Sequence, residues 1–170
     1  GMENGFNLTM IAPNNRYIND HNIAQSVASM LARIGIKVDL RTMPKAQYWQ
    51  EFDMCAADMQ MLGWHSDTED SANSLEFLLM TRNAETGAGQ YNCSYSNPEL
   101  DKLVVAANKE TNPTARATLL QQAERLAYED AAFASTHFQN LAWGARSNVD
   151  LEPIVNAMDM PFYGDLVVNK

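Results

Sequence analysis

A short acidic stretch carries the side chains best suited to act on a ligand. Trp64 and His65 are followed by three carboxylates, Asp67, Glu69 and Asp70. Two carboxylates at a suitable separation catalyse glycoside hydrolysis, so the stretch could belong to a fragment of a carbohydrate-active enzyme. An aspartate in a polar loop is also frequently a helix cap or a solvated charge, and both interpretations stay open.

The histidines and cysteines are poorly placed for metal binding. His21, His65 and His137 lie far apart, and none forms a metal-ligand spacing with Cys55 or Cys93. We therefore predict no protein-only metal site and no cofactor.

The segment before the acidic stretch is rich in aromatic and sulfur-bearing side chains. Trp49 lies beside Tyr48 and Phe52 on an expected short helix, where it could cover a ligand or fill the core. Trp49 is kept as a candidate ligand-binding residue. Four sulfur-bearing side chains could bind copper, but core packing explains them more simply: Met54, Cys55, Met59 and Met61.

Other classes of function lack their usual motifs. The chain has no Gly-x-Ser-x-Gly elbow and no Cys–His signature, which disfavours an enzyme. The glycine-rich connection 87–92 lacks a following Lys-Ser/Thr, so it is interpreted as a flexible loop and not as a phosphate-binding loop. With 12 Lys+Arg against 21 Asp+Glu and no basic stripe, the chain is not expected to bind nucleic acid.

Length and composition predict one globular domain, because the 170 residues are 46% hydrophobic and 19% charged. Gly1 and Met2 resemble the scar of a cleaved tag, so residues 1–2 are set apart from a single α/β lobe over residues 3–170. No apolar run approaches the ~20 residues that cross a bilayer.

The N-terminal part of the chain has the pattern of a βαβ unit. Alternating apolar residues predict a strand that begins at residue 6 and ends at the turn 13–15, and a second strand at 36–41. Apolar residues at spacings of three and four predict a helix between them. Asn19 and Asp20 suit its start, and Gly35 suits a left-handed conformation at its end. Strand, helix and strand in this order imply two parallel strands.

A short helix is expected at 45–52 and a third strand at 58–64, directly before the acidic stretch. Ligands of open α/β sheets bind at the carboxyl ends of the strands, because loops and helix N-termini converge there. Another short helix is expected at 75–79. The predicted fold is therefore α/β, with a parallel or mixed sheet that is built from βαβ units and flanked by helices.

Two further helices have clear start signals. Asn97-Pro98 and Asn112-Pro113 each place a capping residue before a proline at the first helical position, so helices are predicted to about residues 108 and 129. Residues 133–143 and 149–155 have an extended pattern.

The run Tyr95-Ser-Asn-Pro-Glu-Leu-Asp-Lys-Leu103, with Gly63-Trp64 before it and residues 116–130 after it, resembles the peptide and nickel family of periplasmic solute-binding proteins, family 5. The segment from Tyr17 to Val38 is similar to the start of that family's C-terminal lobe. Order and spacing agree from about residue 6 to about residue 150. The resemblance implies one lobe of a periplasmic binding protein type II fold.

In peptide-binding members of the family, an aspartate three positions after a Gly-Trp pair binds the ligand's terminal ammonium. Those positions are Gly63, Trp64 and Asp67 here, and His65 is a further candidate. Such a carboxylate gains strength as a cleft closes and water leaves, and backbone groups around Gly63 would bind the ligand's main chain in strand fashion. The chain departs from the family at residues 68–71, where an aromatic residue and then an acidic residue and a proline are common.

The resemblance also implies partners and a location. Members are roughly three times longer than this chain, so a missing N-terminal lobe of the same protein is expected, with 151–170 as a tail that belongs with it. The other expected partners are a peptide or another small solute and an ABC transporter permease. The implied location is periplasmic or extracellular, and a lipid anchor on the full-length protein is compatible with it. A cytoplasmic ligand-sensing domain of a regulator is the alternative, which the acidic charge disfavours.

In an oxidising compartment we expect Cys55 and Cys93 to pair, since both flank segments that should come together near the loops of the pocket. Two free buried thiols are the alternative.

Overall fold

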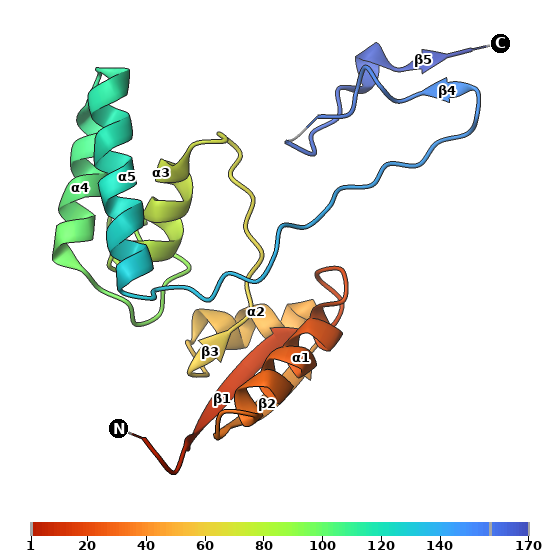
Figure 1. The fold of residues 1–170 in the computed structure, drawn as a ribbon. Coiled ribbons are helices and arrows are strands. Elements are labelled where there is room, and N and C mark those ends of the chain that lie inside the picture. The colour runs from red at the N-terminus through yellow and green to blue at the C-terminus, as the bar shows by residue number, and fades with distance from the viewer. Residues whose placement is uncertain (1, 157, 170) are drawn as a thin grey trace. The chain divides into compact units, whose positions relative to one another are not determined.

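The computed structural model of the chain describes residues 2–156 and 158–169 (Figure 1). The chain divides into two compact units, Gly1–Trp64 and His65–Lys170. Gly1, part of the predicted tag scar, lies outside the described residues. The expectation of a single lobe over residues 3–170, with 151–170 belonging to a missing lobe, stays a prediction.

A three-stranded parallel sheet forms the centre of the first unit. β1 (Phe6–Pro13) pairs along its whole length with β2 (Ile36–Met43), and its Met10 and Ile11 pair with β3 (Met59–Gln60), which gives the order β2-β1-β3. The predicted βαβ unit with parallel strands is thus confirmed. The third strand is present but is shorter than the predicted range 58–64.

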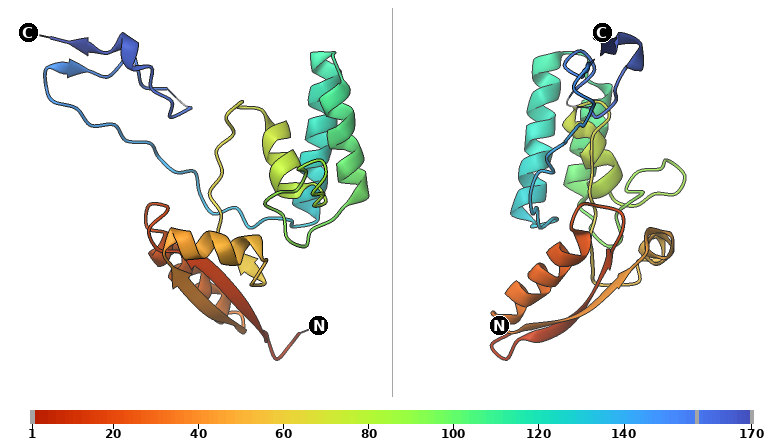
Figure 2. Two further views of the ribbon diagram at one scale, coloured as in Figure 1. Left: turned by 180° about the vertical axis from the view of Figure 1, so that it is seen from behind. Right: turned by 90° about the vertical axis from the view of Figure 1, so that its right-hand side faces the viewer.

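Helices cover both faces of this sheet, because successive side chains of β1 point to opposite faces. On one face, Met10 and Ala12 pack with Ala24 of α1 (Asp20–Ala32), which joins β1 to β2. On the other face lies α2 (Lys45–Asp53), which buries Tyr48 and Phe52 (Figure 2). The predicted α/β class, with a parallel sheet flanked by helices, is confirmed.

The ends of α1 agree in part with the sequence pattern. Gly35, just after the helix, has a φ of 86°, the left-handed conformation predicted there. At the start, the buried Asp20 carboxylate accepts hydrogen bonds from the N–H groups of Arg16 and Tyr17 at 2.8 and 2.9 Å. Asn19 makes no side-chain cap, so Asp20 alone of the two expected capping residues orders this turn.

Two helices, α4 (Pro98–Lys109) and α5 (Pro113–Glu129), pack against each other in the second unit (Figure 1). The Asn97 side chain accepts hydrogen bonds from two backbone N–H groups at 3.0 and 3.3 Å, and Asn112 accepts two at 3.0 Å. Both predicted helix starts are confirmed. Asp130 accepts hydrogen bonds of 2.7 Å from Tyr95 and Asn97, which tie the start of α4 to the end of α5.

A short helix, α3 (Ser71–Ser74), continues directly into a π-helical turn, η1 (Leu75–Leu79). The short helix predicted at 75–79 therefore exists, but its hydrogen bonding is wider than that of an α-helix. The N–H of Met80 donates to the carbonyl of Leu75 at 2.9 Å. The wider turn buries Leu75, Leu78 and Leu79.

The C-terminal part of the chain contains little regular structure. β4 (Val149–Asp150) pairs antiparallel with β5 (Val167–Val168), which follows a 3-10 turn, η2 (Tyr163–Asp165). The extended pattern predicted to residue 155 is wrong beyond β4, where the N–H of Ile154 donates to the carbonyl of Leu151 at 3.0 Å and forms a turn. Within the described ranges, residues 133–143 belong to no sheet. Over the same ranges, no helix combines the length and apolar character that a bilayer crossing requires.

The expected disulfide would join the two units, since Cys55 lies in the first and Cys93 in the second. The pairing stays a prediction. We expect alkylation in denaturant to modify neither cysteine until a reductant is added, with mass spectrometry of the digested protein as the measurement. Because denaturant exposes buried thiols, modification of both cysteines without reductant would instead establish two free thiols.

Candidate functional site

Two tyrosine hydroxyls hold the backbone that follows β3. Tyr48 of α2 donates to the carbonyl of Met61, and Tyr17 donates to the carbonyl of Gly63 at 3.5 Å. A Cβ at Gly63 would lie 2.8 Å from a carbon of the Tyr17 ring, so a larger residue would displace that ring. Trp64 is 37% exposed. Because a carbonyl oxygen has two lone pairs, both carbonyls retain the capacity to accept a hydrogen bond from a ligand.

Trp49 packs within an aromatic cluster on α2. Its ring centroid lies 5.3 Å from that of Tyr48 and 5.3 Å from that of Phe52, both in edge-to-face arrangements. Trp49 itself is half-buried. These contacts suit a residue that fills the core, the simpler of its two interpretations, and a role for Trp49 in ligand binding stays a prediction.

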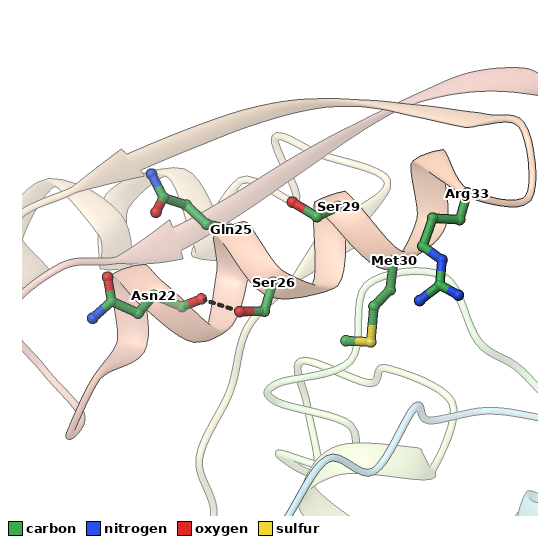
Figure 3. A pocket seen from close by; sticks show the side chains of 6 residues that line it. All are labelled: Asn22, Gln25, Ser26, Ser29, Met30 and Arg33. Carbon is green, nitrogen blue, oxygen red and sulfur yellow. Dashed lines mark hydrogen bonds between the residues drawn. The ribbon is translucent and has the colours of Figure 1, made fainter.

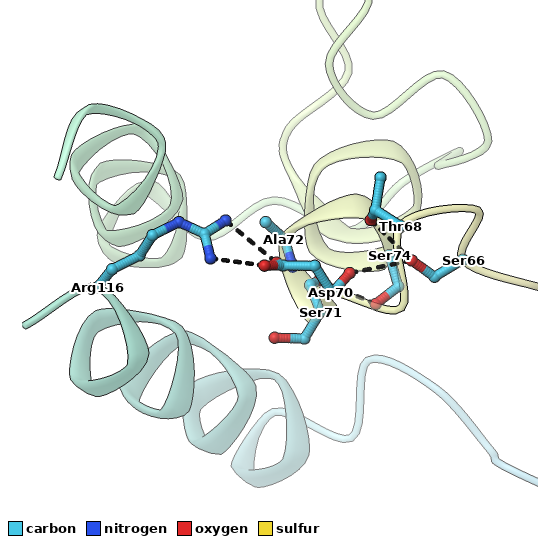
Figure 4. Close-up of polar contacts among 7 residues, drawn as sticks. All are labelled: Ser66, Thr68, Asp70, Ser71, Ala72, Ser74 and Arg116. Carbon is cyan, nitrogen blue, oxygen red and sulfur yellow. Dashed lines mark hydrogen bonds and ion pairs between the residues drawn. The ribbon is translucent and has the colours of Figure 1, made fainter. Parts of the chain in front are cut away.

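Asp67 lies at the corner of a tight turn. The N–H of Glu69 donates to the carbonyl of Ser66 at 3.1 Å, which closes a β-turn over Ser66–Glu69. The Ser66 hydroxyl donates to the carbonyl of Asp70 at 3.1 Å and lies 3.2 Å from the hydroxyl of Thr68 (Figure 4). The turn leaves the Asp67 side chain 86% exposed, so its carboxylate is open to a ligand.

His65 lies beside this turn. Its Nδ1 is 3.9 Å from an Asp67 carboxylate oxygen, and its side chain is 47% exposed. A contact of this length between two exposed side chains contributes little to stability. The structure thus brings His65 and Asp67 together in the second unit, while Gly63, Trp64 and Trp49 belong to the first. That all five form one ligand site stays a prediction.

The carboxylate of Asp70 has two structural partners. Arg116 of α5 donates to it through both terminal nitrogens, at 2.6 and 3.1 Å, and the N–H of Ala72 donates to it at 2.8 Å (Figure 4). The hydrogen bonds from Arg116 hold the pKa of Asp70 below its ordinary value, and the bond from Ala72 acts in the same direction. Of the three carboxylates in the acidic stretch, Asp70 is therefore the helix cap.

The surface of each unit has a hollow. One follows the outer face of α1, as Figure 3 shows, and is lined by Asn22, Gln25, Ser26, Ser29, Met30 and Arg33. The other lies beside the Asp70–Arg116 pair, between the start of α3 and α5. Neither is lined by Gly63, Trp64, His65, Asp67 or Trp49. Across residues 2–156 and 158–169, no three His, Cys, Asp or Glu side chains are grouped as a metal site requires.

Tyr17 and Arg116 contact the candidate residues but were not singled out from the sequence. Tyr17 lies 46 residues before Gly63, and Arg116 lies 46 residues after Asp70, so no local periodicity connects either pair. One weak signal exists for Arg116. It is the fourth residue of α5, where a cation opposes the helix dipole and therefore suggests a partner elsewhere.

The sequence is similar to known solute-binding proteins. Residues 1–86 match the model of the family "Bacterial extracellular solute-binding proteins, family 5 Middle". The oligopeptide-binding protein OppA of Bacillus subtilis (strain 168) is 27% identical over 128 residues, which are 75% of this chain and 23% of that protein. The di/tripeptide-binding protein 4 of Pseudomonas aeruginosa (strain UCBPP-PA14) is 25% identical over 135 residues, or 79% of this chain and 25% of that protein. The chain thus spans about a quarter of the length of these relatives.

Solved structures share the fold. The murein tripeptide binding protein MppA of Escherichia coli superposes with a TM-score of 0.72 at 22% identity, over 97% of this chain and 31% of that one. A dipeptide binding protein of Pseudoalteromonas sp. SM9913, in complex with Met-Leu, superposes with a TM-score of 0.67 at 24% identity, over 78% of this chain and 26% of that one. The α/β architecture is therefore that of periplasmic binding proteins of type II. Because the family model matches half of its residues, the chain belongs to the family 5 bacterial extracellular solute-binding proteins.

Proposed function

We propose that this chain is the ligand-binding lobe of a two-lobed protein that captures peptides, or related small solutes with a free amine, and delivers them to an ABC transporter permease. The observation that carries the proposal is the family match over residues 1–86. The peptide-binding names of the relatives support the substrate class. The second lobe would come from the part of those relatives that the chain does not cover.

The polar groups around the acidic stretch suit the recognition of a peptide. Asp67 offers an exposed carboxylate to the terminal ammonium, and the carbonyls of Met61 and Gly63 offer acceptors to main-chain N–H groups. A charge-assisted hydrogen bond to an ammonium is stronger than a neutral one, and it strengthens further when a closing cleft removes water. Backbone contacts would allow many side-chain types, because they do not read the ligand's sequence.

The geometry of the acidic stretch supports binding over catalysis. A glycosidase needs one carboxyl group whose pKa is raised, so that it can serve as the general acid. Asp70 suits neither this role nor that of the ionised partner, because Arg116 lowers its pKa and, with the N–H of Ala72, occupies both of its carboxylate oxygens. We therefore propose that the protein does not act as an enzyme on its ligand. Its location would be periplasmic or extracellular, and a lipid anchor on the longer protein would hold it near the permease.

The proposal predicts that binding needs both lobes. We expect the two-lobed protein to bind a peptide with a free N-terminus at micromolar concentration or below, and the 170-residue chain alone to bind much more weakly, because one lobe cannot exclude water from the ligand. Calorimetric titration of both proteins with the same tripeptide measures the difference. Micromolar or tighter binding by the chain alone would contradict this expectation, and no binding by either protein would contradict the proposed substrate class.

A further inference from the structure

The turn that carries Asp67 contains a backbone conformation that needs support from its surroundings. Glu69 has a φ of 53°, in the left-handed region that is unfavourable for residues other than glycine. Such conformations persist where neighbouring contacts hold them. The hydrogen bonds of Ser66 lie within residues 66–70, so they shape the turn locally. They do not fix its direction relative to the helices of the second unit.

The Asp70–Arg116 pair connects this turn to the helices. Asp70 directly follows the turn and caps α3, while Arg116 belongs to α5 and lies 46 residues after Asp70 in the sequence. Two parallel N–H···O bonds fix the orientation of a carboxylate as well as its distance, which a lysine ammonium does not do. The two side chains are only 30% and 34% exposed, so water competes less with this pair than with an exposed one.

The Asp70–Arg116 pair also determines which carboxylates of the segment remain exposed as negative charges. Arg116 neutralises the charge of Asp70, and this leaves Asp67 and Glu69 as the exposed carboxylates of the segment. Arg116 gains nothing as a cation near the start of α5, where the helix dipole disfavours positive charge. Its position is therefore explained by the contact with Asp70 and not by the stability of its own helix.

We propose that Arg116 is a positioning residue for ligand binding: through Asp70 it holds the Ser66–Glu69 turn in the orientation that presents the Asp67 carboxylate to an ammonium group. The role rests on the proposed function, and it adds to the binding determinants a residue of α5 that acts through Asp70. Asp70 links Arg116 to the turn, and Asp67 binds the ammonium group.

A first experiment tests the positioning without any ligand. Arg116→Lys keeps the positive charge but loses the bidentate geometry. Arg125→Lys is the matched control, because Arg125 of the same helix pairs with Glu129 at 2.8 Å and is 79% exposed. We expect Arg116→Lys to raise the amide exchange rate of Glu69 about tenfold relative to amides within α5, and the control to leave it unchanged. Unchanged exchange at Glu69 in Arg116→Lys would overturn the positioning role.

A second experiment tests the link to binding in the two-lobed protein. A tripeptide with a free N-terminus is titrated into the wild type, Arg116→Lys, Asp67→Asn and the double variant. We expect Arg116→Lys to weaken binding about tenfold by itself, and to have no further effect once Asp67 is replaced, because the two residues act through one contact. If Asp67→Asn weakens binding but Arg116→Lys does not, or if the two losses simply add, the positioning role is refuted alone. If Asp67→Asn has no effect, the ammonium contact of the proposed function is refuted as well.

Discussion

Replacing Asp67 with asparagine in the two-lobed protein is expected to weaken binding of a peptide with a free N-terminus by about 2–5 kcal/mol. The substitution keeps the shape of the side chain and removes its charge. The ligand's ammonium would then be desolvated in the closed cleft without a charged partner, which is more costly than the loss of an exposed ion pair. Isothermal titration of both proteins with the same tripeptide measures the effect.

Two controls separate this effect from a general disturbance of the turn. An N-acetylated tripeptide carries no ammonium, so its affinity is expected to be the same for wild type and Asp67→Asn. Glu69→Gln removes a second exposed carboxylate from the same turn and is expected to change the affinity little. Equal affinities of wild type and Asp67→Asn for the free peptide would show that Asp67 is a solvated loop charge.

Replacing Asn92 with alanine is expected to lower the free energy of unfolding of the chain by about 3 kcal/mol. Asn92 is 5% exposed, and its side-chain amide donates to the carbonyls of Met80 and Tyr95 at 2.8 and 2.7 Å. Its side-chain oxygen accepts from the N–H of Tyr95 at 3.0 Å. Truncation would leave these backbone groups without partners in a place that water reaches poorly, and urea denaturation measures the cost.

Two further variants test whether the buried hydrogen bonds of Asn92 cause the expected loss of stability. Asn92→Asp keeps the acceptor for the Tyr95 N–H but turns a carboxylate toward two carbonyl oxygens, so it is expected to destabilise the chain at least as much as alanine. Asn108→Ala is the matched control, because Asn108 is exposed and its side chain donates to Glu76 at 3.0 Å. A loss for Asn92→Ala no larger than that for Asn108→Ala would show that Asn92 does not hold this segment together.

The sequence predicts an element correctly where the residues that determine it are neighbours along the chain. Asn97 and Asn112 cap their helices as expected, because a side chain that bonds to N–H groups two and three residues ahead needs no tertiary context. The alternation in β2 has the same local character, because its apolar residues are at least half-buried and its three charged residues, Lys37, Asp39 and Arg41, are exposed. The parallel pairing of β1 and β2 then followed from the helix between them.

Predictions failed or fell short where an element depends on a distant neighbour. Residues 133–143 have an extended pattern, but a strand exists only where another strand satisfies its backbone groups, and among the described residues they join no sheet. The two glycines of residues 87–92 predict a flexible loop. The buried Asn92 side chain instead orders the end of this segment through contacts to residues 12 positions before it and 3 positions after it.

The sequence by itself determined the fold class, the family and the acidic stretch in which the binding residues are expected. Composition, short-range periodicity and motif spacing can be read directly from the order of the residues, because they do not depend on contacts between distant parts of the chain. Only the tertiary structure decided how the carboxylates of that stretch differ. Arg116 lies 46 residues after Asp70 in the sequence and donates hydrogen bonds to its carboxylate. The β-turn over Ser66–Glu69 leaves the Asp67 side chain exposed. One of three similar side chains in a short segment thus has an environment unlike that of the other two, because its partner Arg116 is placed by the packing of helices and not by neighbours along the chain.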